Sequence, residues 1–480
     1  MKSKNGVCLI SMTILAAATS VALASPPQDG QLDSTFSEDG KLTIAFDEPN
    51  STDTDVVFDS VKDALGRTYI VGTVATAIGD RIGITRLGVD GEQDNSYGPD
   101  GDGEVVAPDE VGFNLSGVAA AMDLEGFLLV AGTRNIANNN DFAVCRFDSN
   151  GELAAFSGSD LACRSVAFDL GGQGGADDDF LSDVVVQSDG KIVLVGSATA
   201  NQAPLIIEGA IARLNTDATL DNTFNGIGKQ FFLPSSPANV TTVRLTAAAI
   251  ADNGKIVAVG YNQIEGFPDG DACIVRLDAL GELDNSFDTD GFRSYSTFDG
   301  QRDARFNSVA LMPRLAPLQL VLDQEIAVVG EIEKNPGSGT YNGLLARIQT
   351  TSVPDNRFSV DGFQVDSIGT SLSLEDVEPM YDHSITVAGT TATQQSTRLF
   401  YAARFLTDGA KDTGAFNAPL GYTTLGLDTD INQDVGKALV FHDSRIVMAG
   451  TAVLNAPDFD YGAVGLVRDR IFHDGVERLD

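Results

Sequence analysis

A short apolar run that ends in glycine recurs seven times in this sequence. Examples are "KIVLVG", "KIVAVG" and "RIVMAG", and consecutive copies are 59 to 70 residues apart. The final glycines are Gly72, Gly132, Gly196, Gly260, Gly330, Gly389 and Gly450. A unit of this length can hold four short strands and their turns, so the period predicts a repeat architecture built from small sheets.

Two further markers follow each glycine in order. The first is an apolar strand that carries one arginine, 14 to 18 residues after the glycine. These residues are Arg86, Arg146, Arg213, Arg276, Arg347, Arg404 and Arg468. The second is an aspartate eight residues after the arginine, followed by an aromatic residue three or four positions later. The aspartates are Asp94, Asp221, Asp284, Asp355 and Asp412, and the aromatic residues are Tyr97, Phe224, Phe287, Phe358 and Phe416. The second unit has Ala154 in place of the aspartate.

The two ends of the array are incomplete in a complementary way. No such turn follows Arg468, whereas "GQLDSTFSEDGK" (30–41) has no arginine strand before it. An open array would leave two exposed strand edges, but a closed ring lets 30–46 complete the last unit, which begins near Gln433, and pairs Asp33 with Arg468. The sequence therefore predicts an all-β, seven-bladed β-propeller of four-stranded blades, closed by its N-terminal strand. We expect one domain over 25–472 and a polar tail over 473–480.

The best-preserved unit gives the expected strands within a blade. We predict strands at 183–188, 191–198, 209–215 and 228–233. Asp189-Gly190, and Asn253-Gly254 in the next unit, predict two-residue hairpin loops.

The fixed spacing of arginine and aspartate predicts a structural pair. Blades pack face to face, so an arginine on such a strand loses water and needs a partner, and removing one member of a buried pair typically costs about 3–5 kcal/mol. The aspartate across the turn is the available partner, and the aromatic residue would cover the pair. The alternative is a ring of arginines that faces the central channel and binds an anion, which would not require the matched aspartate.

The three markers together resemble the delta-60 repeat of bacterial secreted and surface proteins. The closest matches are "SDGKIVLVG" (188–196), "IARLNTDATLDNTF" (211–224) and "VRLDALGELDNSFDTDG" (275–291). The resemblance covers nearly the whole chain after residue 24 and implies a propeller-like fold. It implies no catalytic residue and no ligand. Units two, six and seven depart most from the pattern, and unit five carries an insertion near 313–324.

The N-terminus predicts export. Lys2 and Lys4 precede an apolar run, and Ala22-Leu23-Ala24 is typical of a signal-peptide cleavage site after Ala24. An uncleaved anchor is the alternative, but the apolar run is short for a membrane span. We therefore expect a secreted or periplasmic protein without a membrane span. A net charge of −37 without a basic stripe argues against nucleic acid as a partner. We expect a monomer.

Few residues suggest chemistry. Cys145 and Cys163 can form a disulfide in an oxidising compartment, which leaves Cys273 as a free, buried thiol with no catalytic role. His383, His442 and His473 lie far apart in sequence. Carboxylates at alternate positions, Asp100 with Asp102 and Asp288 with Asp290, are typical of Ca²⁺ loops but also of ordinary turns. No catalytic or cofactor-binding residue is predicted, and Ca²⁺ is the one candidate cofactor.

Two functions remain open from the sequence. The first is a binding or scaffold module that recognises a protein or glycan through the loops between blades, such as 170–180, 263–271 and 332–342. The second is a carbohydrate-active hydrolase or lyase with an acidic site at the channel mouth. The second function requires acidic residues from several blades to converge on one rim.

Overall fold

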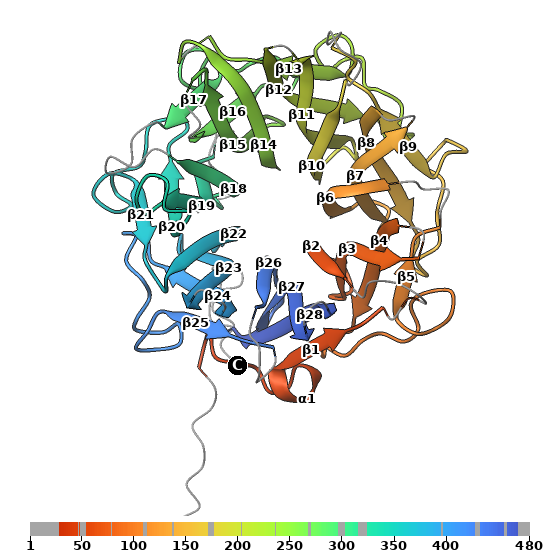
Figure 1. The fold of residues 1–480 in the computed structure, drawn as a ribbon, viewed down its shortest axis with the longest axis vertical. Coiled ribbons are helices and arrows are strands. Elements are labelled where there is room, and N and C mark those ends of the chain that lie inside the picture. Colours follow the sequence, from red (N-terminus) through yellow and green to blue (C-terminus); the bar gives the residue numbers. More distant parts are fainter. Residues whose placement is uncertain are drawn as a thin grey trace, which may run out of the picture.

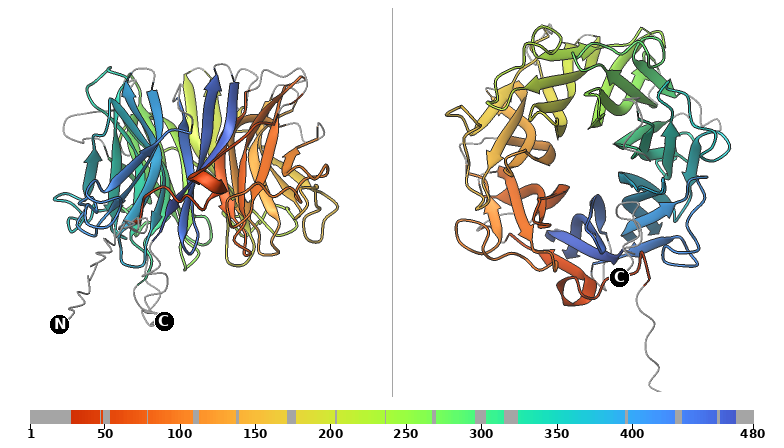
Figure 2. Two further views of the ribbon diagram at one scale, coloured as in Figure 1. Left: turned by 90° about the horizontal axis from the view of Figure 1, so that it is seen from below. Right: turned by 180° about the vertical axis from the view of Figure 1, so that it is seen from behind.

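The computed structural model describes most of the chain as a ring of antiparallel sheets around a central channel (Figures 1 and 2). The described residues are 28–46, 48, 54–77, 79–108, 113–136, 139–170, 177–202, 204–235, 237–266, 270–295, 303–314, 324–394, 397–427, 433–455 and 458–468. The expected signal peptide and the polar tail lie outside these residues, as does most of the insertion in unit five.

Seven blades of four strands form the ring, and in each blade the first strand lies at the channel. Blade 1 contains β2 (Val56–Lys62), β3 (Thr68–Thr76), β4 (Gly79–Leu87) and β5 (Glu104–Val106). Blade 2 contains β6 (Phe113–Met122), β7 (Leu128–Ile136), β8 (Asn139–Phe147) and β9 (Cys163–Val166). Blade 3 contains β10 (Asp179–Val186), β11 (Ile192–Gln202), β12 (Leu205–Leu214) and β13 (Lys229–Phe232). Blade 4 contains β14 (Val240–Ile250), β15 (Ile256–Ile264), β16 (Gly270–Leu277) and β17 (Phe292–Tyr295).

The remaining blades follow the same order. Blade 5 contains β18 (Ala304–Leu311), β19 (Ile326–Glu333), β20 (Tyr341–Ile348) and β21 (Phe363–Asp366). Blade 6 contains β22 (Ser371–Pro379), β23 (Ile385–Gln394), β24 (Thr397–Phe405) and β25 (Tyr422–Leu425). Blade 7 contains β26 (Val435–Phe441), β27 (Arg445–Asn455), β28 (Asp458–Val467) and β1 (Lys41–Ile44).

Blade 7 closes the ring with strands from both ends of the chain. β1 runs antiparallel to β28, with Leu42 opposite Ala463 and Ile44 opposite Tyr461. A single helical turn, α1 (Ser37–Gly40), precedes β1. The side chains of Phe36 and Ile44 pack with Val57 and Ile70 of blade 1 in one core cluster. The predicted fold class and its closure by the N-terminal strand are confirmed.

The strand boundaries in blade 3 agree with the sequence within a few residues, but the predicted turn type is wrong. The backbone of Gln187 bonds to Lys191, and Gly190 donates to the carbonyl of Gln187, so three residues form the loop. Gly190 has a φ of 84°, which closes the longer loop at low steric cost. Blade 4 repeats this arrangement, because Ala251 bonds to Lys255.

The marker glycines face a β-bulge in the first strand of the blade. In blade 3 the register shifts between Leu181 and Asp183, where Leu181 lies opposite Gly196. A Cβ atom on the glycine would lie 1.9–2.1 Å from a carbonyl oxygen of the first strand in six of the blades. These glycines are Gly72, Gly196, Gly260, Gly330, Gly389 and Gly450. The bulge therefore excludes every other residue at this position.

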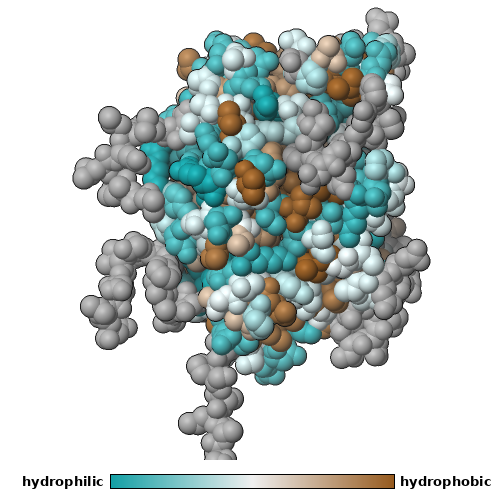
Figure 3. Space-filling view, turned by 90° about the vertical axis from the view of Figure 1, so that its left-hand side faces the viewer, coloured by the Kyte–Doolittle hydropathy of each residue, from teal (hydrophilic) through white to brown (hydrophobic). Residues whose placement is uncertain are grey.

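The outer surface is mainly hydrophilic with scattered hydrophobic side chains on the side shown in Figure 3. Within the described parts of the chain, no helix is both long and apolar enough to span a membrane. The hydrophobic core lies between adjacent blades, as the cluster of Val257 and Ile274 with Phe306 and Leu344 illustrates. Each blade is therefore stabilised mainly by its two neighbours in the ring.

Candidate functional site

The repeated arginine of five blades forms an ion pair with the aspartate eight residues later. The Nε to Oδ2 distances are 2.8 Å for Arg86–Asp94, 2.8 Å for Arg213–Asp221, 2.7 Å for Arg276–Asp284, 2.6 Å for Arg347–Asp355 and 2.8 Å for Arg404–Asp412. The guanidinium carbon lies 4.6–5.4 Å from the ring centroid of the aromatic residue that follows. Each arginine lies one residue before the C-terminal end of the third strand, whereas the first strand lines the channel. These side chains therefore do not form a ring in the channel.

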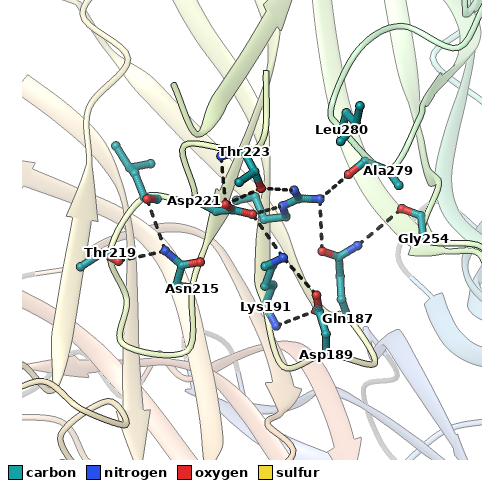
Figure 4. Close-up of polar contacts among 12 residues, drawn as sticks. Gln187, Asp189, Lys191, Asn215, Thr219, Asp221, Thr223, Gly254, Ala279 and Leu280 are labelled. Atoms are coloured by element: carbon teal, nitrogen blue, oxygen red, sulfur yellow. Dashed lines mark hydrogen bonds and ion pairs between the residues drawn. The ribbon is translucent and has the colours of Figure 1, made fainter. Parts of the chain in front are cut away.

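The same arginines also join neighbouring blades. Arg213 donates through Nη1 to the carbonyl oxygen of Ala279 in blade 4, at 2.7 Å. Arg86 makes the matching bond to Ser149, and Arg276 to Thr350. Figure 4 shows Asp221 between Thr223 and Lys191, with Ala279 of the next blade nearby. The motif is therefore both a turn and a contact between blades.

The ion pair lowers the pKa of the aspartate. Burial alone would raise the pKa of Asp221, but hydrogen bonds from Thr223 and the charge of Arg213 lower it to about 2. The pKa of Asp94 and of Asp355 is lowered in the same way. These carboxylates are therefore ionised acceptors rather than proton donors at neutral pH.

Blade 2 compensates for its missing aspartate with two acids from a different turn. Arg146 pairs with Asp123 and Glu125, each at 2.7 Å, and both acids lie in the loop between β6 and β7. Its guanidinium carbon lies 3.6 Å from the ring centroid of Phe127. The arginine keeps two carboxylate partners although Ala154 offers none.

The predicted pair of Arg468 with Asp33 is wrong. Asp33 pairs with Arg445 at 3.0 Å, whereas Arg468 donates to the carbonyl oxygen of His442. Sheet register places Gly465 at the position of the repeated arginine, and a Cβ there would lie 2.5 Å from Phe36. Because Phe36 fills that space, the cation comes from the start of the second strand instead.

Related blades explain why the second strand can supply this charge. Lys191 and Lys255 stand at the position of Arg445 in blades 3 and 4. Their Nζ atoms lie 3.5 Å and 2.8 Å from the carboxylates of Asp221 and Asp284. A basic residue at the start of the second strand thus reaches the aspartate of the turn. In blade 7 this residue, Arg445, pairs with Asp33 although the third strand has no arginine at the repeated position.

Three aspartates of the first strands, which we call the channel aspartates, join neighbouring blades, and sequence reasoning missed them. Asp59, Asp183 and Asp376 each accept a backbone N–H from the next blade, at 2.8, 2.7 and 2.8 Å. The donors are Ala120, Ala248 and Leu439. The other oxygen of each carboxylate accepts the N–H of the following residue. Each of these aspartates lies 13 residues before its marker glycine, and this spacing could have revealed them.

The channel raises the pKa of these acids. Burial, and then the charges of Asp183 and Asp376, raise the pKa of Asp59 to about 8. Burial likewise raises the pKa of Asp183 and of Asp376 to about 6. Since both oxygens of each carboxylate are already acceptors, the geometry assigns them to the contact between blades.

A cavity of about 620 Å³ occupies the channel where the first strands end. Its wall consists largely of small and branched aliphatic side chains from six blades, including Val61, Met122, Val186 and Leu311. Glu378 is the charged residue among the lining residues, and Tyr381 lies at the edge. Burial in the channel, together with the charge of Asp376, raises the pKa of Glu378 to about 7.

Two of the four candidate calcium residues accept backbone N–H groups of their own turns. Asp102 accepts the N–H of Glu104, and Asp290 accepts that of Phe292. Asp288 pairs with Arg293 at 3.0 Å. Asp100 and Asp102 lie in blade 1, whereas Asp288 and Asp290 lie in blade 4. Among the residues described, no three His, Cys, Asp or Glu side chains form a group suited to a metal ion.

The cysteines and histidines form no catalytic group in the described chain. A disulfide joins Cys145 of β8 to Cys163 of β9, and Cys273 is free and buried. Burial raises the pKa of the Cys273 thiol, which removes its nucleophilic character. His442 bonds through Nε2 to the hydroxyl of Thr68 at 2.9 Å, and burial lowers its pKa to about 4. His383 lies in the corresponding turn of blade 6, and His473 lies outside the described residues.

Together, the closed ring, the bulged first strands and the repeated arginine contacts define a seven-bladed β-propeller. Residues 126–153, 187–224 and 252–287 match a family model described as a domain of unknown function (DUF5122) beta-propeller. The chain thus has a β-propeller fold, and these three segments are similar to that family.

Solved structures share this fold at low sequence identity. An ulvan lyase of polysaccharide lyase family PL25 is 10% identical with a TM-score of 0.50, covering 89% of this chain and 96% of the lyase. A protein of unknown function from Dyadobacter fermentans is 10% identical with a TM-score of 0.40, covering 89% of this chain and all of that one. An inactive virginiamycin B lyase from Staphylococcus aureus is 8% identical with a TM-score of 0.44, covering 88% and 98%. No curated protein matches the sequence.

Proposed function

We propose that this propeller is a delta-60 repeat protein that acts as a secreted or periplasmic binding or scaffold module. The observation that carries the proposal is the use of its repeated charges. The arginines pair with aspartates of their own blades and donate to carbonyl groups of the next blade, and the channel aspartates accept backbone N–H groups of the next blade. The repeated charged side chains thus stabilise the ring, while the cavity at the channel mouth presents an apolar surface to a partner.

The alternative is a carbohydrate-active hydrolase or lyase with an acidic channel site. Asp59, Asp183 and Asp376 are the acids that such a site would use. However, the backbone donors hold both oxygens of each carboxylate, so a substrate would have to displace a bond between blades. A net charge of −37 also disfavours an anionic polysaccharide. Sharing a fold with an ulvan lyase does not indicate that this chain acts on the same substrate.

The experiment that separates the two functions measures binding and turnover on the same sample. The purified protein is applied to glycan and peptide arrays, and the bound compounds are then incubated with it and analysed for products by mass spectrometry. Binding without products supports the module. Product formation that is lost in Asp376→Asn, with binding retained, would establish the enzyme.

The compartment and the calcium dependence need their own tests. Export with cleavage after Ala24 predicts a mature chain that begins at Ser25, which mass spectrometry of the secreted or periplasmic protein measures. A Ca²⁺ site at the turns of Asp100, Asp102, Asp288 and Asp290 predicts a higher melting temperature with Ca²⁺ than with EDTA. Equal melting temperatures would leave these residues as turn acceptors. Sedimentation velocity tests the expected monomer.

A further inference from the structure

Among the described residues, most of the exposed large hydrophobic side chains lie in turns on one face of the ring. Of thirteen large hydrophobic residues exposed in the described chain, eleven lie in turns between first and second or between third and fourth strands. They are Leu65, Val89, Leu124, Leu161, Ile227, Leu280, Val353, Val360, Tyr381, Leu406 and Leu420. We call this side the turn face. Leu205 lies on the opposite side, and Phe231 lies in an outer strand.

Acidic side chains accompany these hydrophobic residues. Exposed acids directly adjoin five of them, in the pairs Val89-Asp90, Leu124-Glu125, Asp160-Leu161, Val360-Asp361 and Tyr381-Asp382. Arg146 already pairs with Glu125. Basic side chains also occur on this face, as with Arg357, which pairs with Glu325 and Asp355. Acids therefore adjoin exposed hydrophobic side chains on this face in blades 1, 2, 5 and 6.

The channel cavity opens toward this same face. Its lining includes the last residues of the first strands, such as Met122, Ile250 and Leu311, and it includes Tyr381 of the turn face. A cavity of about 620 Å³ has room for more than one large side chain. An apolar centre within a rim of mixed apolar and acidic turns is an arrangement typical of an interaction site.

We propose that the turn face binds a cationic amphipathic segment of a partner protein. One or two apolar side chains of that segment enter the channel cavity, and its Lys or Arg residues pair with the acids of the surrounding turns. This inference rests on the proposed binding function and names its partner class. A second copy of the chain would present a surface of the same acidic character, and an anionic lipid surface would be repelled, so charge complementarity favours a basic polypeptide.

The test uses a fluorescein-labelled amphipathic Lys/Leu peptide and fluorescence anisotropy. Two control peptides carry Glu in place of every Lys, or Ser in place of every Leu. We expect the Lys/Leu peptide to bind at least about tenfold more tightly than either control. Affinity should fall when salt rises from about 0.05 M to about 0.5 M, because the exposed charges become screened.

Matched variants place the peptide on the turn face. Leu311→Asp introduces a charge into the cavity, and Tyr381→Ser removes an exposed side chain at its edge. We expect each to weaken peptide binding by about tenfold, whereas Leu205→Ser on the opposite side leaves it unchanged. Because Leu311 is partly buried, thermal melts check its fold, and Tyr381→Ser keeps the test valid if that variant unfolds.

Several outcomes would overturn the inference. Equal binding of the Glu peptide would remove the charge argument, and loss of binding in Leu205→Ser would place the site elsewhere. Binding of the protein to zwitterionic phosphatidylcholine vesicles that Tyr381→Ser abolishes would make this face a lipid surface instead. If the Lys/Leu peptide does not bind but a ligand from the arrays binds both the wild type and Tyr381→Ser, the protein is still a binding module. That result would refute only the proposal that the turn face is the binding site. No binding in either experiment would refute both.

Discussion

Asp33 and Arg445 form an ion pair at 3.0 Å although they lie near opposite ends of the chain. Backbone bonds from Gly30 to Val467 and from Asp33 to Gly465 run beside this pair. The N-terminal segment therefore supplies the turn, the carboxylate and the outer strand that blade 7 lacks. Ring closure depends on a contact between the first and the last segments of the ring.

Removal of 28–46 tests this closure. We expect a large fall in the melting temperature and aggregation, because β28 would become an exposed edge and the core around Phe36 and Ile44 would lose one side. Differential scanning calorimetry measures the change, and a synthetic peptide of 28–46 added in trans should restore part of it. Unchanged melting of the truncated protein would show that the ring does not need this strand.

The ion pair within blade 3 can be tested at Arg213 and Asp221. Arg213→Ala leaves a buried carboxylate without its main partner, so we expect a loss of about 3–5 kcal/mol in the free energy of unfolding. The double variant with Asp221→Ala should lose less than the sum of the single variants, since the two charges are coupled. Urea unfolding of the four proteins measures the coupling. Additive effects would mean that the two side chains act independently.

The bulge predicts a severe effect at Gly260. A Cβ there would lie 1.9 Å from the carbonyl oxygen of Arg244, so Gly260→Ala must move one strand against the other. We expect a loss of about 3 kcal/mol or more in stability. Gly414→Ala is the matched control, because its Cβ would lie 3.7 Å from the nearest side-chain atom, the Oδ1 of Asp412. Equal stability of the two variants in urea would refute the steric explanation.

The channel acids predict that stability falls as pH rises. Asp59 has a pKa of about 8 in the folded protein, well above its value in the unfolded chain, so the folded state holds more protons between about pH 4 and pH 8. Its contribution to stability is therefore complete below about pH 4 and is lost as pH rises toward 8. Asp221, with a pKa of about 2, acts in the opposite sense and loses its contribution as pH falls from about 4 toward 2.

Asp59→Asn isolates the channel effect, because asparagine resembles the protonated acid. We expect the variant to narrow the difference between the urea midpoints at pH 5 and at pH 8. The urea midpoint of the variant should be higher than that of the wild type at pH 8 and equal to it at pH 5. A larger difference between the two pH values than in the wild type would contradict the raised pKa.

Sequence reasoning predicted best the contacts that recur in nearly every blade. Gly196 and its six equivalents recur because a bulge in the first strand recurs opposite them. The spacing of Arg213 and Asp221 recurs because one turn joins them. These contacts lie within single units and repeat with them. Their period therefore predicted the number of blades, and the incomplete units at the two ends predicted the closure of the ring.

Contacts that depart from the repeated pattern were harder to predict. Arg445 replaces the expected Arg468 because Phe36, which is more than 400 residues away in sequence, fills the space above Gly465. Asp123 and Glu125 replace the missing aspartate from a turn that carries no marker. The channel cavity arises only when six blades bring their first strands together.

The place of β1 in blade 7 has a consequence for biosynthesis. The ribosome makes this strand before every other strand of the ring, yet its partner β28 is the last strand to appear. During that interval β1 has no partner strand, although Phe36 and Ile44 can already pack on blade 1, and blade 7 has no finished outer edge. The nascent chain must therefore keep β1 without its partner until β28 has been made, so closure of blade 7 is the last step in forming the ring.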